Sequence, residues 1–193
     1  QYIPQDALSS FDPRYRVQDI IAENLAGLPE RKQQRERIVS LLELVGLSAE
    51  YLERRPRSLS GGQRQRVSIA RALAAEPALI VCDEPVSALD ICIQAQVLDL
   101  LAELQSKLGM ALLFISHDLG VIEHLADRVL VFHDGRVVEQ GTVEAVLGHP
   151  QQPYTRALLA AVPDIQRGLT ARAQVAGAIV AGPAQGTEAA TGG

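Results

Sequence analysis

The chain has no tryptophan, one methionine and only two cysteines, Cys82 and Cys92, among its 193 residues. Two cysteines cannot build a disulfide framework, and they lack the paired spacing of a zinc site. Their scarcity excludes the small disulfide-rich and zinc-stabilised classes of protein. It also favours a reducing compartment, in which we expect both thiols to be structural.

Long apolar runs and an excess of positive charge are also missing. No apolar stretch reaches the roughly 18 residues that a membrane-spanning helix needs, so the sequence predicts no such helix. Residues 1–5 have neither the basic start nor the apolar stretch of a secretory signal. With 18 basic and 23 acidic residues, the net charge of -5 offers no general attraction for nucleic acid. We therefore expect no nucleic-acid partner, and membrane contact only through another protein.

Helical patterns dominate the sequence upstream of Pro77. Residues 1–16 contain turn-forming Pro, Ser and Asp and are expected to be irregular. From residue 17 onward, apolar residues recur at helical spacing, most regularly at Ile38, Leu41, Leu42 and Val45. These patterns predict a small helical subdomain over about residues 14–75.

After Pro77 the pattern changes to short apolar runs separated by amphipathic helices. Buried strands are expected at residues 79–82, 111–115 and 129–132, and Asp134-Gly135 is typical of a hairpin turn after the last of them. Alternating strands and helices predict an open α/β sheet, in which ligands bind at the carboxyl ends of the strands.

A helix start at Ser60 is the first candidate ligand site. Ser60 is a favoured cap residue, and good helix formers follow from Gln63. Between them, Gly61 and Gly62 allow close backbone approach. The amide groups and the dipole at such a helix start attract anions, most naturally phosphate. The alternative is an ordinary capped helix after a glycine-containing loop.

Polar residues at the ends of two predicted strands are the other candidates. Asp83 and Glu84 are adjacent, so their side chains diverge, and one can hold Mg²⁺ while the other faces an attacking water. Ser116, His117 and Asp118 are consecutive and cannot line up as a hydrolytic triad. His117 alone can instead contact a phosphate, or it is an ordinary surface or core histidine.

Together these stretches resemble the motifs of ABC-type ATPases, in the family's order. The signature motif is matched by Leu59-Ser60-Gly61-Gly62-Gln63, and the Walker B strand by Leu79-Ile80-Val81-Cys82-Asp83-Glu84-Pro85. The D-loop is matched by Ser87-Ala88-Leu89-Asp90, and the switch-histidine loop by Ser116-His117-Asp118. Ile3-Pro4-Gln5-Asp6 is similar to the Q-loop, although Pro4 stands where an aromatic residue is more usual.

The resemblance implies a P-loop NTPase-like α/β fold, an ABC ATPase core with a small helical subdomain. It places a partial ABC ATPase domain at 1–148, with the Q-loop at 3–6 and the stretch from Walker B to the switch histidine inside 76–140. A C-terminal segment at 149–163 and a low-complexity tail at 164–193 follow. The tail is rich in Ala, Gly and Thr without a period, and we expect it to be disordered.

The resemblance also implies catalytic roles, and ATP and Mg²⁺ as cofactors. Asp83 would bind Mg²⁺, and Gln5 would sense the metal and the attacking water while its loop faces a transmembrane subunit. Glu84 would be the general base toward that water, and His117 would contact the γ-phosphate.

A second group of residues would act on a nucleotide held mainly by another ABC ATPase subunit. Asp90 would lie across the dimer interface. The residues that would reach the shared nucleotide from the signature motif are Ser60, Gly61, Gly62 and Gln63.

Two segments resemble one branch of the family, the ATP-binding subunits of dipeptide, oligopeptide and nickel importers. They are Ser10-Phe11-Asp12-Pro13-Arg14 and residues 153–163. The iron-sulfur cysteine cluster of some members is missing, because no cysteine follows Cys92. The resemblance implies ATP hydrolysis that energises import of peptides or a related small solute. The subunit would be peripheral on the cytoplasmic side of the cell membrane, with permease subunits and, indirectly, a substrate-binding protein as partners.

The phosphate-cradling motif of this family, Gly-x-x-x-x-Gly-Lys-Ser/Thr, occurs nowhere in the 193 residues. The family has this P-loop upstream of the Q-loop, and the chain starts near Gln5 without a methionine. We therefore expect a truncated sequence, and weak ATP binding by this chain alone. Two alternatives stay open: a soluble ABC ATPase that moves no solute, and a non-hydrolytic fragment that supplies only the signature half-site.

Overall fold

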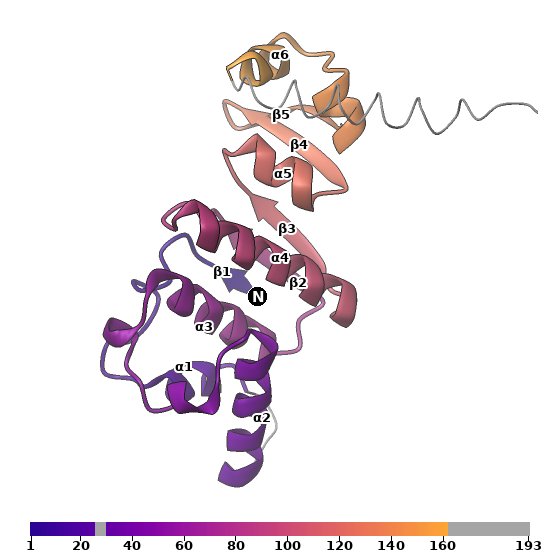
Figure 1. Cartoon of the computed structure of the whole chain (residues 1–193). Coiled ribbons are helices and arrows are strands. Elements are labelled where there is room, and N and C mark those ends of the chain that lie inside the picture. The colour runs from indigo at the N-terminus through magenta and orange to yellow at the C-terminus, as the bar shows by residue number, and fades with distance from the viewer. Residues whose placement is uncertain (26–29, 162–193) are drawn as a thin grey trace, which may run out of the picture. The chain divides into compact units, whose positions relative to one another are not determined.

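The computed structural model describes residues 1–25 and 30–161 of the chain. It divides into two compact units, one from Gln1 to Val121 and the other from Ile122 onward. Figure 1 labels the helices and strands in chain order. The low-complexity tail expected at 164–193 lies outside the described residues, and the division of the sequence at 148 and 163 stays a prediction.

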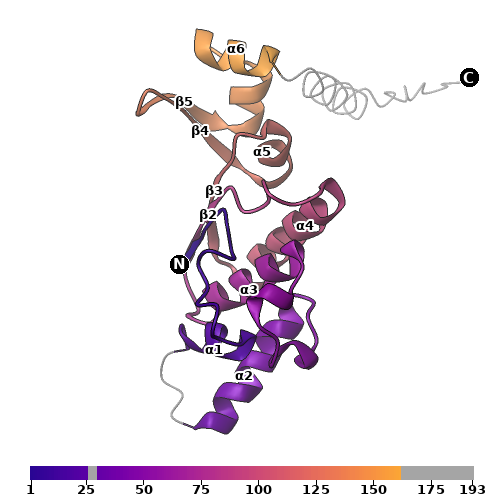
Figure 2. The ribbon, with the colours of Figure 1, turned by 90° about the vertical axis from the view of Figure 1, so that its left-hand side faces the viewer.

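A parallel three-stranded sheet forms the frame of the first unit. Its strands are β1 (Tyr2–Ile3), β2 (Leu79–Asp83) and β3 (Ala111–Ile115), in the order β1-β2-β3 (Figures 1 and 2). The central position of β2 explains its continuous apolar run, because Ile80 and Cys82 are fully buried. Burial also raises the pKa of the Cys82 thiol to about 12, as expected of a structural cysteine.

The strand β1 corrects the expectation that residues 1–16 are irregular throughout. Tyr2 pairs with Val81, and Ile3 pairs with Cys82, so the strand exists through contacts with residues far along the chain. Two residues are too few to show the alternation that identifies a strand in a sequence. Ile3 is nevertheless fully buried, and this pairing fixes the position of the loop that follows.

Helices of the first unit pack around α3 (Gly61–Leu73). They are α1 (Val17–Ala22) and α2 (Arg31–Leu44), joined to α3 by the short 3-10 helices η1 (Ala49–Tyr51) and η2 (Pro56–Ser58). The helix predicted from the spacing of Ile38 to Val45 is confirmed as α2. Figures 1 and 2 show α1, α2 and α3 clustered together.

Arg71 on α3 anchors the loop that leaves β1. Its guanidinium donates to the carbonyl and to the hydroxyl of Ser10, both at 3.0 Å, and lies 5.0 Å from the centroid of the Phe11 ring. Burial lowers the pKa of this guanidinium, which nonetheless stays charged. Arg71 thus holds the middle of the loop between β1 and α1.

The helix α4 (Ile91–Leu108) follows β2 and leads to β3. It begins at Asp90, whose carboxylate accepts from the backbone N–H of Ile93 at 3.1 Å. It ends at Gly109, whose φ of +65° favours a residue without a Cβ. Leu101 and Leu104 bury one face of the helix. Cys92, in its first turn, is exposed, so the expected structural role fails for this cysteine.

The second unit contains an antiparallel hairpin and short helices. The strands β4 (Arg128–His133) and β5 (Arg136–Thr142) are followed by η3 (Glu144–Gly148) and α6 (Pro153–Ala160), while α5 (Leu119–Leu125) spans the boundary between the units. We predicted that residues 129–132 would extend the open α/β sheet, and this is wrong. In the described part of the chain they pair with β5 in a separate two-stranded sheet, and Asp134 and Gly135, with φ of 47° and 73°, close the predicted tight turn between the two strands.

Candidate functional site

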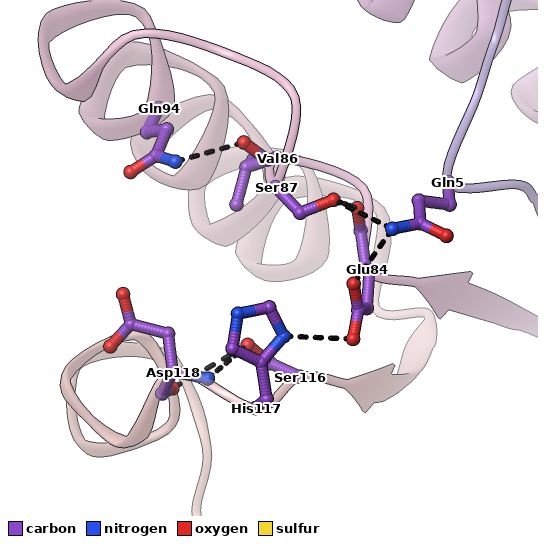
Figure 3. Close-up of polar contacts among 8 residues, drawn as sticks. All are labelled: Gln5, Glu84, Val86, Ser87, Gln94, Ser116, His117 and Asp118. Carbon is purple, nitrogen blue, oxygen red and sulfur yellow. Dashed lines mark hydrogen bonds and ion pairs between the residues drawn. The ribbon is translucent and has the colours of Figure 1, made fainter.

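The carboxyl ends of the three parallel strands bring distant polar residues together. β1 leads to Gln5, β2 to Glu84 and β3 to His117, and parallel strands place these ends at one edge of the sheet. Figure 3 shows the three side chains converging on the Glu84 carboxylate. Three residues that were predicted separately therefore form one cluster.

Both carboxylate oxygens of Glu84 have partners in this cluster. Gln5 Nε2 donates to Glu84 Oε2 at 2.9 Å and to Ser87 Oγ at 3.2 Å, while His117 Nδ1 lies 2.8 Å from Glu84 Oε1. The hydrogen bond to Glu84, followed by the charge of that carboxylate and a weaker contribution from Asp118, raises the pKa of His117. The imidazole itself remains exposed. It can accordingly reach a ligand while bound to Glu84.

The backbone of Glu84 has an unusual conformation. Its φ is +43°, in the left-handed region that residues with a side chain rarely adopt, and Pro85 follows directly. The Glu84 N–H donates to the carbonyl of Ile115 at 2.9 Å. The Glu84 carbonyl accepts from the N–H of Ser87 at 3.2 Å and from its hydroxyl at 3.1 Å. Strain of this kind is kept where surrounding contacts hold it, often at functional sites.

Asp83 and Glu84 have separate partners, as their adjacency predicted. Tyr2 donates its hydroxyl to Asp83 Oδ2 at 2.8 Å, and this hydrogen bond raises the pKa of Tyr2. Tyr2 was not predicted as a site residue, because its contact with Asp83 depends on the pairing of β1 with β2.

The oxygen atoms of Asp83 and Gln5 are of the kind that Mg²⁺ prefers, so the donor chemistry fits that ion. Among the described residues, no group of three or more His, Cys, Asp and Glu side chains could hold a metal. Mg²⁺ commonly takes only one or two carboxylates from the protein, with water and phosphate as its other ligands. The residues present therefore suit a metal that arrives with a nucleotide.

The start of α3 is a reciprocal cap. Ser60 Oγ accepts from the N–H of Gln63 at 3.3 Å, and Gln63 Oε1 accepts from the N–H of Ser60 at 2.9 Å. Gln63 Nε2 also donates to the hydroxyl of Tyr51 at 3.0 Å. These side chains are thus committed to the local structure, and none of these hydrogen bonds reaches the Glu84 cluster.

The two glycines of α3 have a packing role. A Cβ added to Gly62 would lie 2.5 Å from Ile93 Cγ2, and one added to Gly61 would lie 3.0 Å from Leu89 Cδ2. The glycines therefore let α3 approach the first turn of α4 and the loop before it. Close packing therefore explains why glycine stands at both positions, and this explanation needs no ligand.

Asp90 and Gln94 support the loop between Glu84 and α4. Asp90 caps the helix, and Gln94 Nε2 donates to the carbonyl of Val86 at 2.9 Å (Figure 3). Asp90 was predicted as a site residue, whereas Gln94 was not. No signal in the sequence points to Gln94, since a polar residue in a first helical turn is common.

Two family models match the chain in separate regions. Residues 1–87 match the model described as ABC transporter, and residues 138–187 match the one described as Oligopeptide/dipeptide transporter, C-terminal region. Over these residues the chain is similar to ABC transporter proteins. The family resemblance found in the sequence is confirmed, and the second match includes the segment from Pro153 on which the branch was predicted.

Curated relatives of this chain are named for peptide transport. It is 47% identical over 171 residues to the Dipeptide transport ATP-binding protein DppF of Haemophilus influenzae, covering 88% of this chain and 52% of the relative. It is 51% identical over 177 residues to the Oligopeptide transport ATP-binding protein OppF of Escherichia coli, covering 88% and 53%. The chain thus spans about half the length of these relatives.

A solved ABC cassette shares the fold. A dimeric ATP-binding cassette in a post-hydrolysis state, bound to ADP and phosphate, matches with a TM-score of 0.63 and 26% identity, covering 74% of this chain and 63% of the other. The fold is therefore that of a partial ABC ATPase core, as predicted. Within residues 1–25 and 30–161, no helix is both long and apolar enough to cross a membrane.

Proposed function

We propose that the protein containing these residues is the ATP-hydrolysing subunit of a peptide importer. The observation that carries the proposal is the Glu84 carboxylate, held between Gln5 and His117 at the ends of parallel strands. Such a carboxylate is placed to accept a proton from water beside a phosphate. The names of the relatives supply the solute class, since they are transport proteins for dipeptides and oligopeptides.

In this mechanism Glu84 accepts the proton of the attacking water. His117, which lies 2.8 Å from Glu84 through Nδ1, contacts the γ-phosphate through the rest of its exposed ring. Asp83 and Gln5 would hold Mg²⁺, and Gln5 also donates to Glu84 and so orients it. When bound, Mg²⁺ neutralises charge on the phosphate oxygens.

The start of α3 is proposed to serve a nucleotide bound by a second ABC ATPase subunit. The helix presents backbone N–H groups and the positive end of its dipole, both of which favour phosphate. Asp90 caps α4 and would place its loop at the subunit interface. The residues proposed to contact the shared nucleotide are Ser60, Gly61, Gly62 and Gln63.

The proposed assembly consists of two ATPase subunits on the cytoplasmic side of the cell membrane, two permease subunits and a substrate-binding protein. The solved dimeric cassette with ADP and phosphate supports the dimer, and the match over residues 138–187 supports the peptide-importing branch. In this assembly the loop of Gln5 faces the permease and couples hydrolysis to transport.

Uptake of a labelled dipeptide and a labelled oligopeptide into vesicles tests the proposal. The vesicles contain the gene product that includes these residues, together with its permeases and binding protein. We expect ATP-dependent uptake that Glu84→Gln abolishes. Glu103→Gln is the matched control, because Glu103 is an exposed residue of α4 that pairs with Lys107 at the surface. Hydrolysis without uptake of either peptide would overturn the transport assignment.

A further inference from the structure

The loop from Glu84 to Asp90 is held from two sides. On one side, Ser87 binds the Glu84 carbonyl through its N–H and its hydroxyl, and the same hydroxyl accepts from Gln5. On the other side, Gln94 Nε2 donates to the carbonyl of Val86, which also accepts from the N–H of Leu89 at 3.1 Å. The loop connects the strained backbone of Glu84 to the rigid start of α4.

Gln94 is well placed to fix this loop. It lies in the first turn of α4, whose start Asp90 caps, so its backbone is held by the helix. Its contact with the Val86 carbonyl is partly buried, and Val86 as a whole residue is only 4% exposed. A hydrogen bond sheltered from water in this way resists exchange with solvent more than one on the surface does.

Val86 connects the hydrogen bond of Gln94 to the catalytic cluster. Val86 lies two residues after Glu84 and directly before Ser87, so a shift of its peptide group moves both neighbours. Ser87 would then lose its contacts with Glu84 and Gln5, which lie within 3.2 Å. The φ of +43° at Glu84 would also lose part of its support.

We infer that Gln94 is a positioning residue, which holds Glu84 and Gln5 in their reactive arrangement through Val86 and Ser87. The inference rests on the proposed function, because it takes Glu84 as the base. Gln94 touches neither nucleotide nor metal in this account. Its loss therefore slows the chemical step and leaves nucleotide binding unchanged.

The test uses the gene product that includes these residues and a matched pair of variants. Gln94→Met removes the amide but keeps the length of the side chain, and Gln94→Glu replaces the donor with an acceptor. Gln96→Met is the control, because Gln96 is exposed on the same helix and has the same side chain. The kcat and KM for ATP are measured for each, with Glu84→Gln as the reference without a base.

For Gln94→Met and Gln94→Glu we expect kcat to fall about 5- to 10-fold, the usual effect of one lost hydrogen bond. The KM for ATP should stay within about twofold of the wild type, and Gln96→Met should match the wild type in both values. Without nucleotide, histidine NMR should show the pKa of His117 falling in the two Gln94 variants, because Glu84 is then less well placed beside it.

Several results would overturn the inference. One is a wild-type kcat in both Gln94 variants while Glu84→Gln is inactive, which would leave the proposed function intact. Another is a loss of kcat that only follows a loss of folded protein, with the pKa of His117 unchanged. Full turnover in Glu84→Gln is a different result. It would show that Glu84 is not the base, and the proposed function and the role of Gln94 would then both fail.

Discussion

The start of α3 and the Glu84 cluster are built in opposite ways. At the start of α3, Ser60 and Gln63 bind each other across three positions of the chain. In the cluster, Gln5 and His117 reach Glu84 from 79 and 33 positions away. The first is a local structure that a short segment specifies, whereas the second exists only once three strands have paired.

This difference separates residues that have a local structural role, whatever ligand they also meet, from residues that only the assembled sheet brings together. Gly62 packs against Ile93, and Ser60 caps α3, so both residues have structural roles that need no ligand. The imidazole of His117 beside Glu84 is exposed, so it has no comparable role in packing or capping. Changes at the start of α3 should therefore affect stability, and changes in the cluster should affect charge and catalysis.

Gly62→Ala should give the largest change in stability. The added Cβ would lie 2.5 Å from Ile93 Cγ2, and overpacking of this kind costs about 1–3 kcal/mol in the free energy of unfolding. Urea unfolding of the variant measures it. Ile93→Ala in the same protein makes room for the methyl group, so the double variant should show a smaller cost of Gly62→Ala. An equal cost in both backgrounds would contradict the packing explanation.

Ser60→Ala should have a smaller effect, about 0.5–2 kcal/mol in the free energy of unfolding, because one helix cap is lost. The control is Ser60→Asn, which keeps an oxygen at the cap and should stay close to the wild type. If the two variants were equally destabilised, capping would not be the role of this side chain.

The smallest expected effect is a change in the pKa of His117. Its hydrogen bond with Glu84 holds the pKa above the usual value near 6.5, and Glu84→Gln should return it toward that value. Because the pKa of His117 is higher in the folded than in the unfolded protein, its protonated form stabilises the fold. This stabilisation is complete below the pKa of the unfolded state and is lost as the pH rises through the raised pKa of the folded state. An NMR titration measures this, with His124→Gln used only to distinguish its signal from that of His117. An unchanged pKa in Glu84→Gln would show that the two side chains do not interact in solution.

Local patterns in the sequence predicted much of the fold. The spacing of Ile38 to Val45 predicted α2, the cap at Ser60 predicted the start of α3, and Asp134-Gly135 predicted the hairpin turn. The strand β1 was not predictable, because two residues carry no periodic signal and its pairing with β2 is long-range. The separate sheet of β4 and β5 was missed for a related reason: an apolar run does not show which strand it will pair with.

The candidate site was only partly predictable. Strand ends and the family resemblance identified Gln5, Glu84 and His117, but the hydrogen bonds among them needed the structure. Tyr2 and Gln94 were missed altogether. Their contacts depend on the pairing of β1 with β2 and on the path of the loop before α4, which no local pattern specifies.

The most direct test of the account is single-turnover ATP hydrolysis by Glu84→Gln in the gene product that includes this chain. We predict that the variant binds ATP as the wild type does, that its dimer stays closed, and that hydrolysis slows about 10²- to 10⁴-fold because the general base is gone. Glu103→Gln should hydrolyse ATP at the wild-type rate. Hydrolysis by Glu84→Gln at that same rate would contradict the central claim that the Glu84 cluster is the hydrolytic site.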